Sequence, residues 1–419
     1  METLETTCAI VGGGPAGMML GLLLARNGVD VVVLEKHADF FRDFRGDTIH
    51  PSTIGVLGEL GLREAFLGLP HTSVPRLDVV VNGNRVHAID FGRLRPPDDF
   101  LVLAPQWDFL TFLAEKARRH PGFRLMMESD ATELIRDGGA VRGVRVSGPD
   151  GEREVRAALV VSADGRGSAL REQAGLRPRR FGVPIDVLWF RLPKPDGLPA
   201  HTLAYIGSAG MVVTIEREDY LQVGLIIPKG GFGRLQASGL GAFREAVAQA
   251  APHLHEALET IDDWEQVKLL SVQIDRLPRW YRHGYLAIGD AAHAMSPAFG
   301  VGVNYAIQDA VVAANVLTGT LRRAGRPTVP GARAAEAEID LRLLDAVQRR
   351  RVPPVAAMQR IQLAAHRYIS RPEGVRLLPD PLPAPLRLAL AAATPGMQAV
   401  SSRLIGRGLR PESVSPELR

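Results

Sequence analysis

A glycine-rich stretch near the start of the chain has the residue types and spacing of a phosphate-binding turn. Residues 12–17 read GGGPAG and fit the pattern G-x-G-x-x-G, with the candidate binding residues Gly12, Gly14, Pro15, Ala16 and Gly17. In such a turn the first glycine permits tight bending and the second lets the backbone approach a pyrophosphate. The third glycine lets a helix pack on a strand, and the N-terminus of that helix attracts negative charge. Residues 12–17 therefore predict a dinucleotide site.

Glu35 strengthens this interpretation because it ends the apolar run VDVVVL at residues 29–34. An acidic side chain about twenty residues after the glycines can accept hydrogen bonds from the two hydroxyl groups of a ribose. The pattern predicts a strand at 7–12, a helix at 15–27 and a strand at 29–34, which is the order of a βαβ unit. This fingerprint alone fits NAD and FAD equally well.

Two further aspartates follow apolar runs later in the chain. Residues 160–168 read VVSADGRGS and put Asp164 at the end of one run, and residues 285–290 read YLAIGD and end another with Gly289 and Asp290. Small residues then continue through AAHAMSPAFGVGVN, at residues 291–304. A strand-end carboxylate followed by so little side-chain bulk indicates that a large group lies against this backbone.

With these three motifs in order over roughly residues 8–320, the chain resembles the single-component FAD-dependent aromatic hydroxylases of the para-hydroxybenzoate hydroxylase type. The resemblance implies that the glycine motif binds the ADP half of noncovalent FAD. It implies that Asp164 serves both FAD and the reduced nicotinamide, and that Gly289 and Asp290 hold the ribityl chain. NADPH or NADH would reduce FAD, and O2 would form a flavin C4a-hydroperoxide that hydroxylates an aromatic ring. The sequence singles out no catalytic base.

The resemblance also implies further cofactor-binding positions, which are Lys36, Arg45, Gln106, Ala131, Pro297, Gly300, Gly302, Val303 and Asn304. Lys36 could equally be a solvated side chain. A long helix opening at Asn304 would direct its N-terminus at the pyrimidine end of the flavin, where its dipole favours negative charge. His293 is expected to form a local hydrogen bond. Phe299 and Val301 depart from the family, which carries a glycine and a glutamine there.

Around these motifs the sequence predicts an α/β fold, with a Rossmann-like FAD-binding domain, an inserted antiparallel-sheet substrate domain and a helical C-terminus. The FAD-binding domain is expected to be discontinuous, and proline breaks are expected at Pro353 and Pro354. The expected boundaries are 1–75, 101–182 and 276–330 for the FAD-binding domain, 76–100 and 183–275 for the substrate domain, and 331–419 for the helical region.

Alternating strands in the insert predict the substrate pocket. Because successive strand residues point to opposite faces, some apolar residues there should line a cavity, while core packing is the alternative for each. The candidates are Leu188, Phe190, Met211, Val213 and Leu225, with Phe299 beside the flavin. No charged cluster occurs among them, so a fairly hydrophobic phenol-, quinone- or polyketide-like substrate is expected.

Composition narrows the remaining possibilities. The 419 residues are 46% hydrophobic, and the net charge of +4 comes from scattered basic residues, so nucleic acid is not an expected partner. The one cysteine, Cys8, excludes an internal disulfide and a thiolate metal cluster, and no metal is expected. The apolar stretch 386–406 is interrupted by Pro395, so no membrane span is expected. We expect a cytoplasmic monomer or simple dimer.

Two other functions remain open at the level of sequence. A flavin-dependent halogenase would share the cofactor motifs, but the tryptophans at positions 107, 189, 264 and 280 do not form the W-x-W-x-I-P signature of many halogenases. A non-catalytic FAD-binding electron-transfer protein would not require the insert. Oxygen-dependent consumption of NAD(P)H would distinguish an oxygenase from such a carrier.

Overall fold

One mixed sheet, here called the N-terminal sheet, carries all three motifs in the computed structural model. The structure describes residues 2–41, 48–195, 202–207, 210–217, 219–325, 334–369 and 383–419. The parallel strands lie in the order β20 (Tyr285–Ala287), β11 (Gly151–Ser162), β1 (Glu2–Val11), β2 (Val31–Leu34) and β8 (Phe123–Met126). The central strands are apolar and buried for most of their length, as expected for parallel strands covered on both faces.

An antiparallel meander extends the N-terminal sheet beyond β11. Its strands are β9 (Asp130–Asp137) and β10 (Ala140–Gly148), and β19 (Tyr281–Arg282) pairs with the edge of β20 that faces away from β11. Gly138 and Gly139 join β9 to β10 with φ angles of 54° and 82°. Both angles lie in the left-handed region that glycine adopts without steric cost, so the Asp-Gly-Gly sequence forms the turn.

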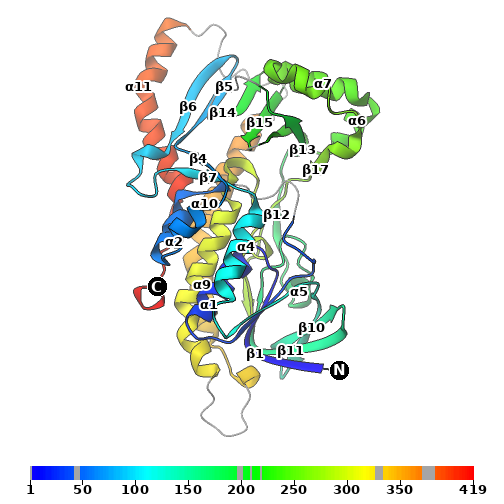
Figure 1. The fold of residues 1–419 in the computed structure, drawn as a ribbon, viewed down its shortest axis with the longest axis vertical. Coiled ribbons are helices and arrows are strands. Elements are labelled where there is room, and N and C mark those ends of the chain that lie inside the picture. Colours follow the sequence, from blue (N-terminus) through cyan, green and yellow to red (C-terminus); the bar gives the residue numbers. More distant parts are fainter. Residues whose placement is uncertain are drawn as a thin grey trace.

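Helices α1 (Pro15–Arg26), α4 (Gln106–Ala117) and α9 (Gly302–Ala324) pack together along the N-terminal sheet (Figure 1). Residues 16–25 of α1 are all buried, which explains the small and apolar composition of this helix. The helix α9 begins at Gly302, not at the expected Asn304. The difference arises because the Tyr305 amide already donates to the Val301 carbonyl, which adds residues to the first turn.

Shorter elements connect these layers. A small antiparallel sheet links β3 (Thr48–Ile49), β7 (Leu101–Leu103) and β4 (Thr72–Val74), and another pairs β12 (Arg179–Phe181) with β18 (Ile274–Arg276). The remaining short helices are α2 (Pro51–Glu59), α3 (Arg63–Leu67), α5 (Ala169–Gln173), α6 (Phe232–Ala237) and α8 (His255–Leu258).

A second sheet, here called the insert sheet, occupies the other end of the molecule (Figure 1). Its strand order is β17 (Lys268–Leu270), β13 (Ile185–Pro193), β16 (Tyr220–Pro228), β15 (Gly210–Glu216), β14 (Thr202–Gly207), β5 (Arg76–Val81) and β6 (Asn84–Asp90). The pairs are antiparallel except that β14 runs parallel to β5. This parallel pair unites strands that are more than a hundred residues apart in the sequence.

The two faces of the insert sheet belong to different cores. One face packs against α7 (Gly239–Ala250) and forms a separate hydrophobic cluster. On the opposite face Val187 and Trp189 belong to the main hydrophobic core, against which Val213 and Ile226 also pack. Strand alternation therefore sends neighbouring residues of one strand into different environments.

Helix α10 (Leu341–Ile369) runs through Pro353 and Pro354, so the expected proline break at these residues is wrong. A proline inside a helix costs roughly 3 kcal/mol of helix stability. Tertiary contacts offset this cost, because Arg351, Val355 and Met358 on either side of the prolines are fully buried. The last long helix, α11 (Ala384–Ser401), packs against β6.

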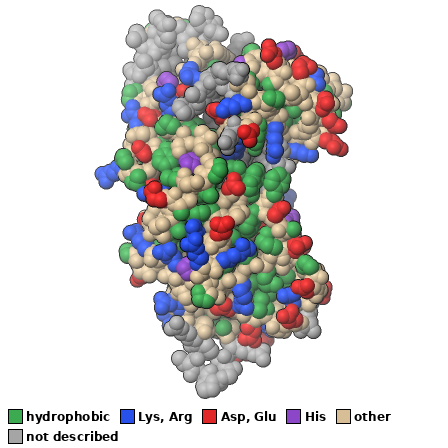
Figure 2. Space-filling model, in the orientation of Figure 1, with side chains coloured by type: hydrophobic (Ala, Val, Ile, Leu, Met, Phe, Trp, Pro, Cys, Tyr) green, Lys and Arg blue, Asp and Glu red, His purple; other side chains and the backbone are tan. Residues whose placement is uncertain are grey.

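The architecture agrees with the expected α/β fold, which has an inserted sheet and a helical C-terminal region. On the face shown in Figure 2, basic and acidic side chains are interspersed. No helix in the described part of the chain combines the length and the apolar character needed to cross a membrane. Cys8 is buried in β1, and burial raises the pKa of its thiol, which makes it a poor nucleophile.

Candidate functional site

The three sequence motifs meet at one edge of the N-terminal sheet. Strands β1, β11 and β20 are parallel neighbours, and their carboxyl ends lead into Gly12, Asp164 and Gly289. A Cβ atom added at Gly12 would lie 2.4 Å from the Ala163 carbonyl oxygen, and one at Gly289 would lie 3.1 Å from the Ala16 Cβ. The glycine motif therefore packs closely against both of the other motifs. In open α/β sheets this edge is where ligands bind.

The glycine motif combines close packing with open space. Gly12 has φ of 103°, and a Cβ atom at Gly17 would lie 2.0 Å from the Gly12 carbonyl oxygen. A Cβ atom at Gly14, by contrast, would meet no atom of the described residues within 4 Å. Gly14 precedes α1, Pro15 is the first residue of that helix, and no side chain caps its N-terminus. The helix amides therefore face a space that a phosphate could fill.

Glu35 is buried beside the glycine motif. Its Oε2 accepts a hydrogen bond from the Gly13 amide at 3.0 Å, and its Oε1 accepts one from the His37 amide at 3.1 Å. These two hydrogen bonds fix the orientation of the Glu35 carboxylate beside the glycine motif. Lys36 is exposed. The Ser129 amide donates to the Glu35 carbonyl, which brings buried Ala131 of β9 to the same side.

The small-residue loop after Asp290 is tied to the segment that follows residue 47. Thr48 Oγ1 donates to the Gly300 carbonyl at 2.8 Å, and Gly300 has φ of 62°. Asn304 is buried, and its Oδ1 accepts hydrogen bonds from the His50 amide at 2.9 Å and from Thr53 Oγ1 at 2.7 Å. The amide side chain of Asn304 thus anchors this loop to the start of α2.

Other expected cofactor positions lie around the same loop. Val303 is buried, Pro297 is exposed, and a Cβ atom at Gly302 would meet nothing within 4 Å. Gln106 is the first residue of α4 and follows Leu103 by three residues. Leu103 pairs with Thr48, and Thr48 is hydrogen-bonded to Gly300, so the start of α4 lies on the side of this loop. Arg45 lies outside the described residues.

Asp164 sits in a buried polar cluster at the end of β11. The hydroxyl of Ser162 donates to Asp164 Oδ1, and the Ser162 and Ser168 hydroxyls are 3.0 Å apart. Burial raises the pKa of Asp164, while hydrogen bonds from Ser162 and Ser168 oppose this shift. Burial also raises the pKa of the neighbouring Tyr285 hydroxyl, and the Asp164 charge adds to the shift. Ser162 was not singled out by the sequence, because it lies inside an ordinary apolar run.

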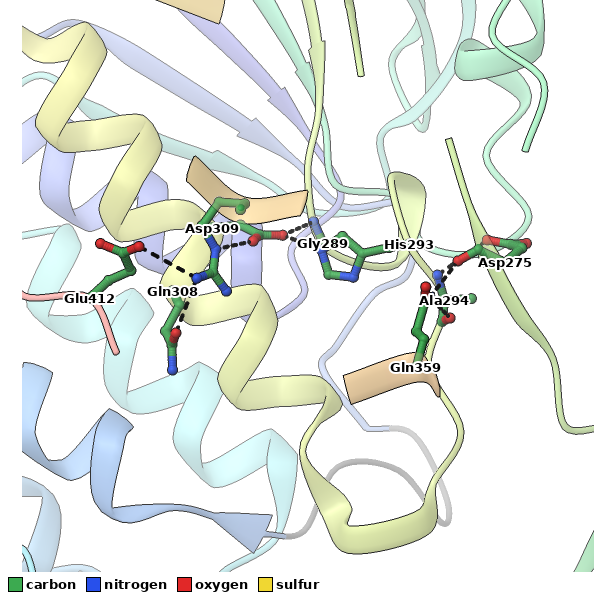
Figure 3. Close-up of polar contacts among 9 residues, drawn as sticks. Asp275, Gly289, His293, Ala294, Gln308, Asp309, Gln359 and Glu412 are labelled. Carbon is green, nitrogen blue, oxygen red and sulfur yellow. Dashed lines mark hydrogen bonds and ion pairs between the residues drawn. The ribbon is translucent and has the colours of Figure 1, made fainter. Parts of the chain in front are cut away.

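A buried charge network contacts the backbone of Gly289 (Figure 3). Asp309 of α9 accepts hydrogen bonds from the Gly289 amide at 2.9 Å and from His293 Nε2 at 2.6 Å. Its second oxygen accepts from Arg351 Nε of α10 at 2.8 Å. The expectation of a local hydrogen bond at His293 agrees with this contact. Asp309 and Arg351 were not predicted, since each reads as an ordinary polar residue of a helix.

The residues predicted to line the substrate pocket fall on opposite faces of the insert sheet. Leu188, Phe190 and Leu225 belong to the cluster against α7, where the Phe190 and Phe243 ring centroids are 5.1 Å apart. Met211 and Val213 lie on the other face, since Met211 pairs with Ile226 and Val213 with Gly224. The structure thus brings only part of the predicted set toward the main core.

Phe299 has an unusual backbone conformation, with φ of 68° and ψ of 0°. Its half-buried side chain packs against the main core. A residue with a Cβ atom in this left-handed region costs roughly 1 to 2 kcal/mol relative to the right-handed one. Such strain is retained where surrounding contacts demand it, often at functional sites.

Gln222 is a further candidate that sequence analysis missed. It is buried on β16, and it pairs across the strands with Ile215 and Arg191 on the face directed at the main core. The sequence could have indicated this position, because Gln222 alternates along the strand with Gly224 and Ile226 and therefore shares their face of the sheet. Among the described residues, no three His, Cys, Asp or Glu side chains cluster in a way that could hold a metal ion.

Comparison with known proteins identifies the group that this edge accommodates. Residues 5–331 match the family model described as an FAD binding domain. The chain is 32% identical to a 6-methylpretetramide 4-monooxygenase from Streptomyces rimosus, over 96% of this chain and 92% of the relative. It is 24% identical to a 1H-pyrrole-2-carbonyl-[peptidyl-carrier protein] brominase from Pseudoalteromonas luteoviolacea, over 74% of this chain and 76% of that one.

A solved structure supports the fold. The anhydrotetracycline hydroxylase OxyS from Streptomyces rimosus superposes with a TM-score of 0.73 at 21% identity, over 96% of this chain and 76% of that chain. At that identity the similarity shows the fold alone.

The residues present fit FAD. Gly14, Gly165 and Gly302 belong to the three motifs that converge at the sheet edge. Within the described part of the chain, a Cβ atom added at any of them would meet nothing within 4 Å. The N-termini of α1 and α9 have no side-chain caps, so their amides remain available for an anionic group and a flavin. The family match and the identity to a curated monooxygenase over nearly the whole chain agree with this geometry. The chain belongs to the FAD-dependent monooxygenases of the aromatic hydroxylase type.

Proposed function

We propose that this enzyme hydroxylates a fairly hydrophobic aromatic compound, phenol-, quinone- or polyketide-like, with electrons from NADPH or NADH. The observation that carries the proposal is the 32% identity, over 96% of the chain, to a relative named 6-methylpretetramide 4-monooxygenase. The apolar face of the insert sheet, with Met211, Val213 and Ile226, supports a hydrophobic substrate.

In this proposal FAD binds noncovalently along the edge where the motifs meet. The amides after Gly14 bind the pyrophosphate, Glu35 accepts from the adenosine ribose, and Asp290 accepts from a ribityl hydroxyl. The N-terminus of α9 would lie toward the flavin, where the helix dipole would favour negative charge. When bound, FAD supplies the redox and oxygen chemistry, and the chain's own residues bind, orient and exclude water.

Asp290→Ala tests the cofactor assignment. Loss of the carboxylate should leave a ribityl hydroxyl unpaired and weaken FAD binding by about 1 to 3 kcal/mol. Titration of the apoprotein with FAD, followed by flavin fluorescence, measures the change. Asp150→Ala, at an exposed turn, is the matched control and should bind FAD like the parent. An unchanged dissociation constant for Asp290→Ala would remove Asp290 from the cofactor site.

Gln222→Leu tests the substrate face. A buried amide on an apolar wall can orient a hydroxyl or carbonyl group of the substrate, so its loss should lower kcat/KM by a factor corresponding to about 1 to 3 kcal/mol. FAD affinity should not change. Leu225→Val, on the face against α7, is the control and should lower the melting temperature while substrate preference stays the same. Equal kinetics for Gln222→Leu and the parent would contradict a substrate contact.

A substrate screen tests the reaction itself. Purified protein with bound FAD is incubated with aromatic compounds, NADH or NADPH and O2, while NAD(P)H oxidation and product mass are followed together. We expect oxidation that depends on substrate and a product heavier by one oxygen atom. A halogenated product formed in the presence of bromide or chloride would instead support the halogenase alternative. The absence of oxygen-dependent turnover with every substrate would favour an electron carrier.

We further propose that the enzyme works in the cytoplasm as a monomer or simple dimer. The reductant is a cytoplasmic metabolite, and a single buried cysteine suits a reducing compartment. Fractionation without detergent and sedimentation analysis of the purified protein test these two points. Recovery in the membrane fraction would contradict the first, and a larger assembly would contradict the second.

A further inference from the structure

Asp309 holds the backbone at the start of the Gly289–Asp290 motif. It is fully buried, and one of its oxygens accepts from both the Gly289 amide and His293 Nε2. Because a carboxylate can only accept, Nε2 of His293 must carry the proton in this contact. Gly289 has φ of 58° and begins a short 3-10 turn that contains Asp290. The bond from its amide therefore sets the direction in which the chain enters that turn.

Asp309 depends on a positive partner to remain ionised. Burial raises the pKa of its carboxyl group, but the charges and hydrogen bonds of His293 and Arg351 outweigh burial, and the pKa is lowered overall. Arg351 is itself fully buried, with its Nε 2.8 Å from Asp309 Oδ1. A buried carboxylate without such a partner tends to take up a proton, and the neutral carboxyl group is a weaker acceptor for the Gly289 amide.

The other side of Arg351 faces the C-terminal segment. Its Nη1 lies 3.2 Å from Gln308 Oε1 and 3.6 Å from Glu412 Oε1. Glu412 is also buried and pairs with Arg350 at 2.7 Å. A continuous series of charged side chains thus runs from Glu412 through Arg351 and Asp309 to the backbone of Gly289 (Figure 3).

We propose that Arg351 is a positioning residue for the cofactor, acting from α10 through Asp309 on the turn that carries Asp290. The inference rests on the proposed contact between Asp290 and the ribityl chain. The hydrogen bonds of Arg351 within the described residues go to Asp309 and Gln308, so its effect on the turn passes through the Asp309 carboxylate. Glu412 of the C-terminal segment lies 3.6 Å from Arg351 Nη1, whereas Arg351 Nε is 2.8 Å from Asp309 Oδ1.

Three variants of the full chain test this role: Arg351→Met, Arg351→Lys and Arg350→Met. Arg351→Met should raise the dissociation constant for FAD by roughly tenfold or more, within the span typical of coupled sites. Arg351→Lys should recover most of the lost affinity because it keeps a positive charge near Asp309, although it lacks the planar fork of arginine. Arg350→Met is the matched control, because it removes a cation from Glu412 while the bond between Arg351 and Asp309 remains.

The readouts are the FAD dissociation constant, the melting temperature of the apoprotein and the visible circular dichroism of the bound flavin. The proposal predicts weaker binding and an altered flavin signal for Arg351→Met, with the signal restored in Arg351→Lys and unchanged in Arg350→Met. If Arg351→Met does not fold, Asp309→Asn keeps the volume, removes the charge and should weaken FAD binding likewise.

Three results would overturn the proposal. These are equal loss of FAD affinity in Arg350→Met and Arg351→Met, no recovery in Arg351→Lys, or a lower melting temperature with unchanged FAD affinity and flavin signal. Asp290→Ala, measured in parallel, distinguishes the role of Arg351 from the cofactor contact of Asp290. If Asp290→Ala binds FAD weakly and Arg351→Met does not, only the role of Arg351 is wrong. If Asp290→Ala is unaffected, the assigned cofactor contact is wrong.

Discussion

Alanine at Gly17 is expected to destabilise the protein strongly, whereas alanine at Gly14 should leave it folded but deficient in FAD. The Cβ atom of an alanine at position 17 would lie 2.0 Å from the Gly12 carbonyl oxygen and 3.2 Å from Ile10 Cγ2. The first contact is with backbone of the tight turn, which cannot move aside as a flexible side chain can. We expect a loss of about 3 kcal/mol in the free energy of unfolding, at the upper end of overpacking effects.

The Gly14 variant separates binding from stability. Gly14 has an extended backbone with φ of −74°, and a Cβ atom there meets nothing within 4 Å, so an alanine is tolerated in the apoprotein. The added methyl group would occupy the space into which the proposed pyrophosphate fits. FAD affinity should fall by tenfold or more, which corresponds to about 1.4 kcal/mol.

Melting temperatures of the apoproteins and FAD titrations of both variants measure these effects. Gly233→Ala is a suitable control, since a Cβ atom there also meets nothing within 4 Å and the residue lies in α6, away from the motifs. If Gly14→Ala binds FAD as tightly as the parent, the phosphate does not lie at the N-terminus of α1.

Replacement of Phe299 is expected to change the substrate range and to reveal strain in the loop. The backbone of Phe299 lies in the left-handed region, where a Cβ atom is sterically unfavourable. Glycine has no Cβ atom and adopts this conformation without that cost. Phe299→Gly should therefore be more stable than Phe299→Ala by about 1 kcal/mol, although both lose the contacts of the ring. If the ring lines the cavity, both variants should accept bulkier substrates and bind the native one more weakly, by roughly 2 to 3 kcal/mol.

Steady-state kinetics across a set of aromatic substrates, with melting temperature and FAD content, distinguish the outcomes. A cavity role predicts an altered substrate profile with FAD retained in both variants. A core role predicts a lower melting temperature of both variants with the profile unchanged, which would end the pocket hypothesis. Equal stability of the glycine and alanine variants would show that the loop relaxes when the ring is removed.

The sequence by itself determined the parts of this protein that depend on local pattern. The βαβ unit around Gly12 and Glu35 could be predicted because uninterrupted apolar runs, a glycine turn and a strand-end acid occur within a short stretch. The aspartates at 164 and 290 were recognisable for the same reason, since each follows a buried strand. Together these motifs were sufficient to predict the fold class, the enzyme family and its cofactor.

Only the tertiary structure decided how distant segments meet. Both faces of the insert strands are apolar, so alternation could not tell that Leu188 faces α7 while Val213 faces the main core. The bond between Asp309 and Arg351 spans 42 residues, and neither side chain carries a local signal of its partner. The continuation of α10 through Pro353 likewise results from burial of its neighbours, which outweighs local helix propensity. Which distant residues pair and which side chains are buried depends on the packing of the whole chain, so a short stretch of sequence cannot determine either.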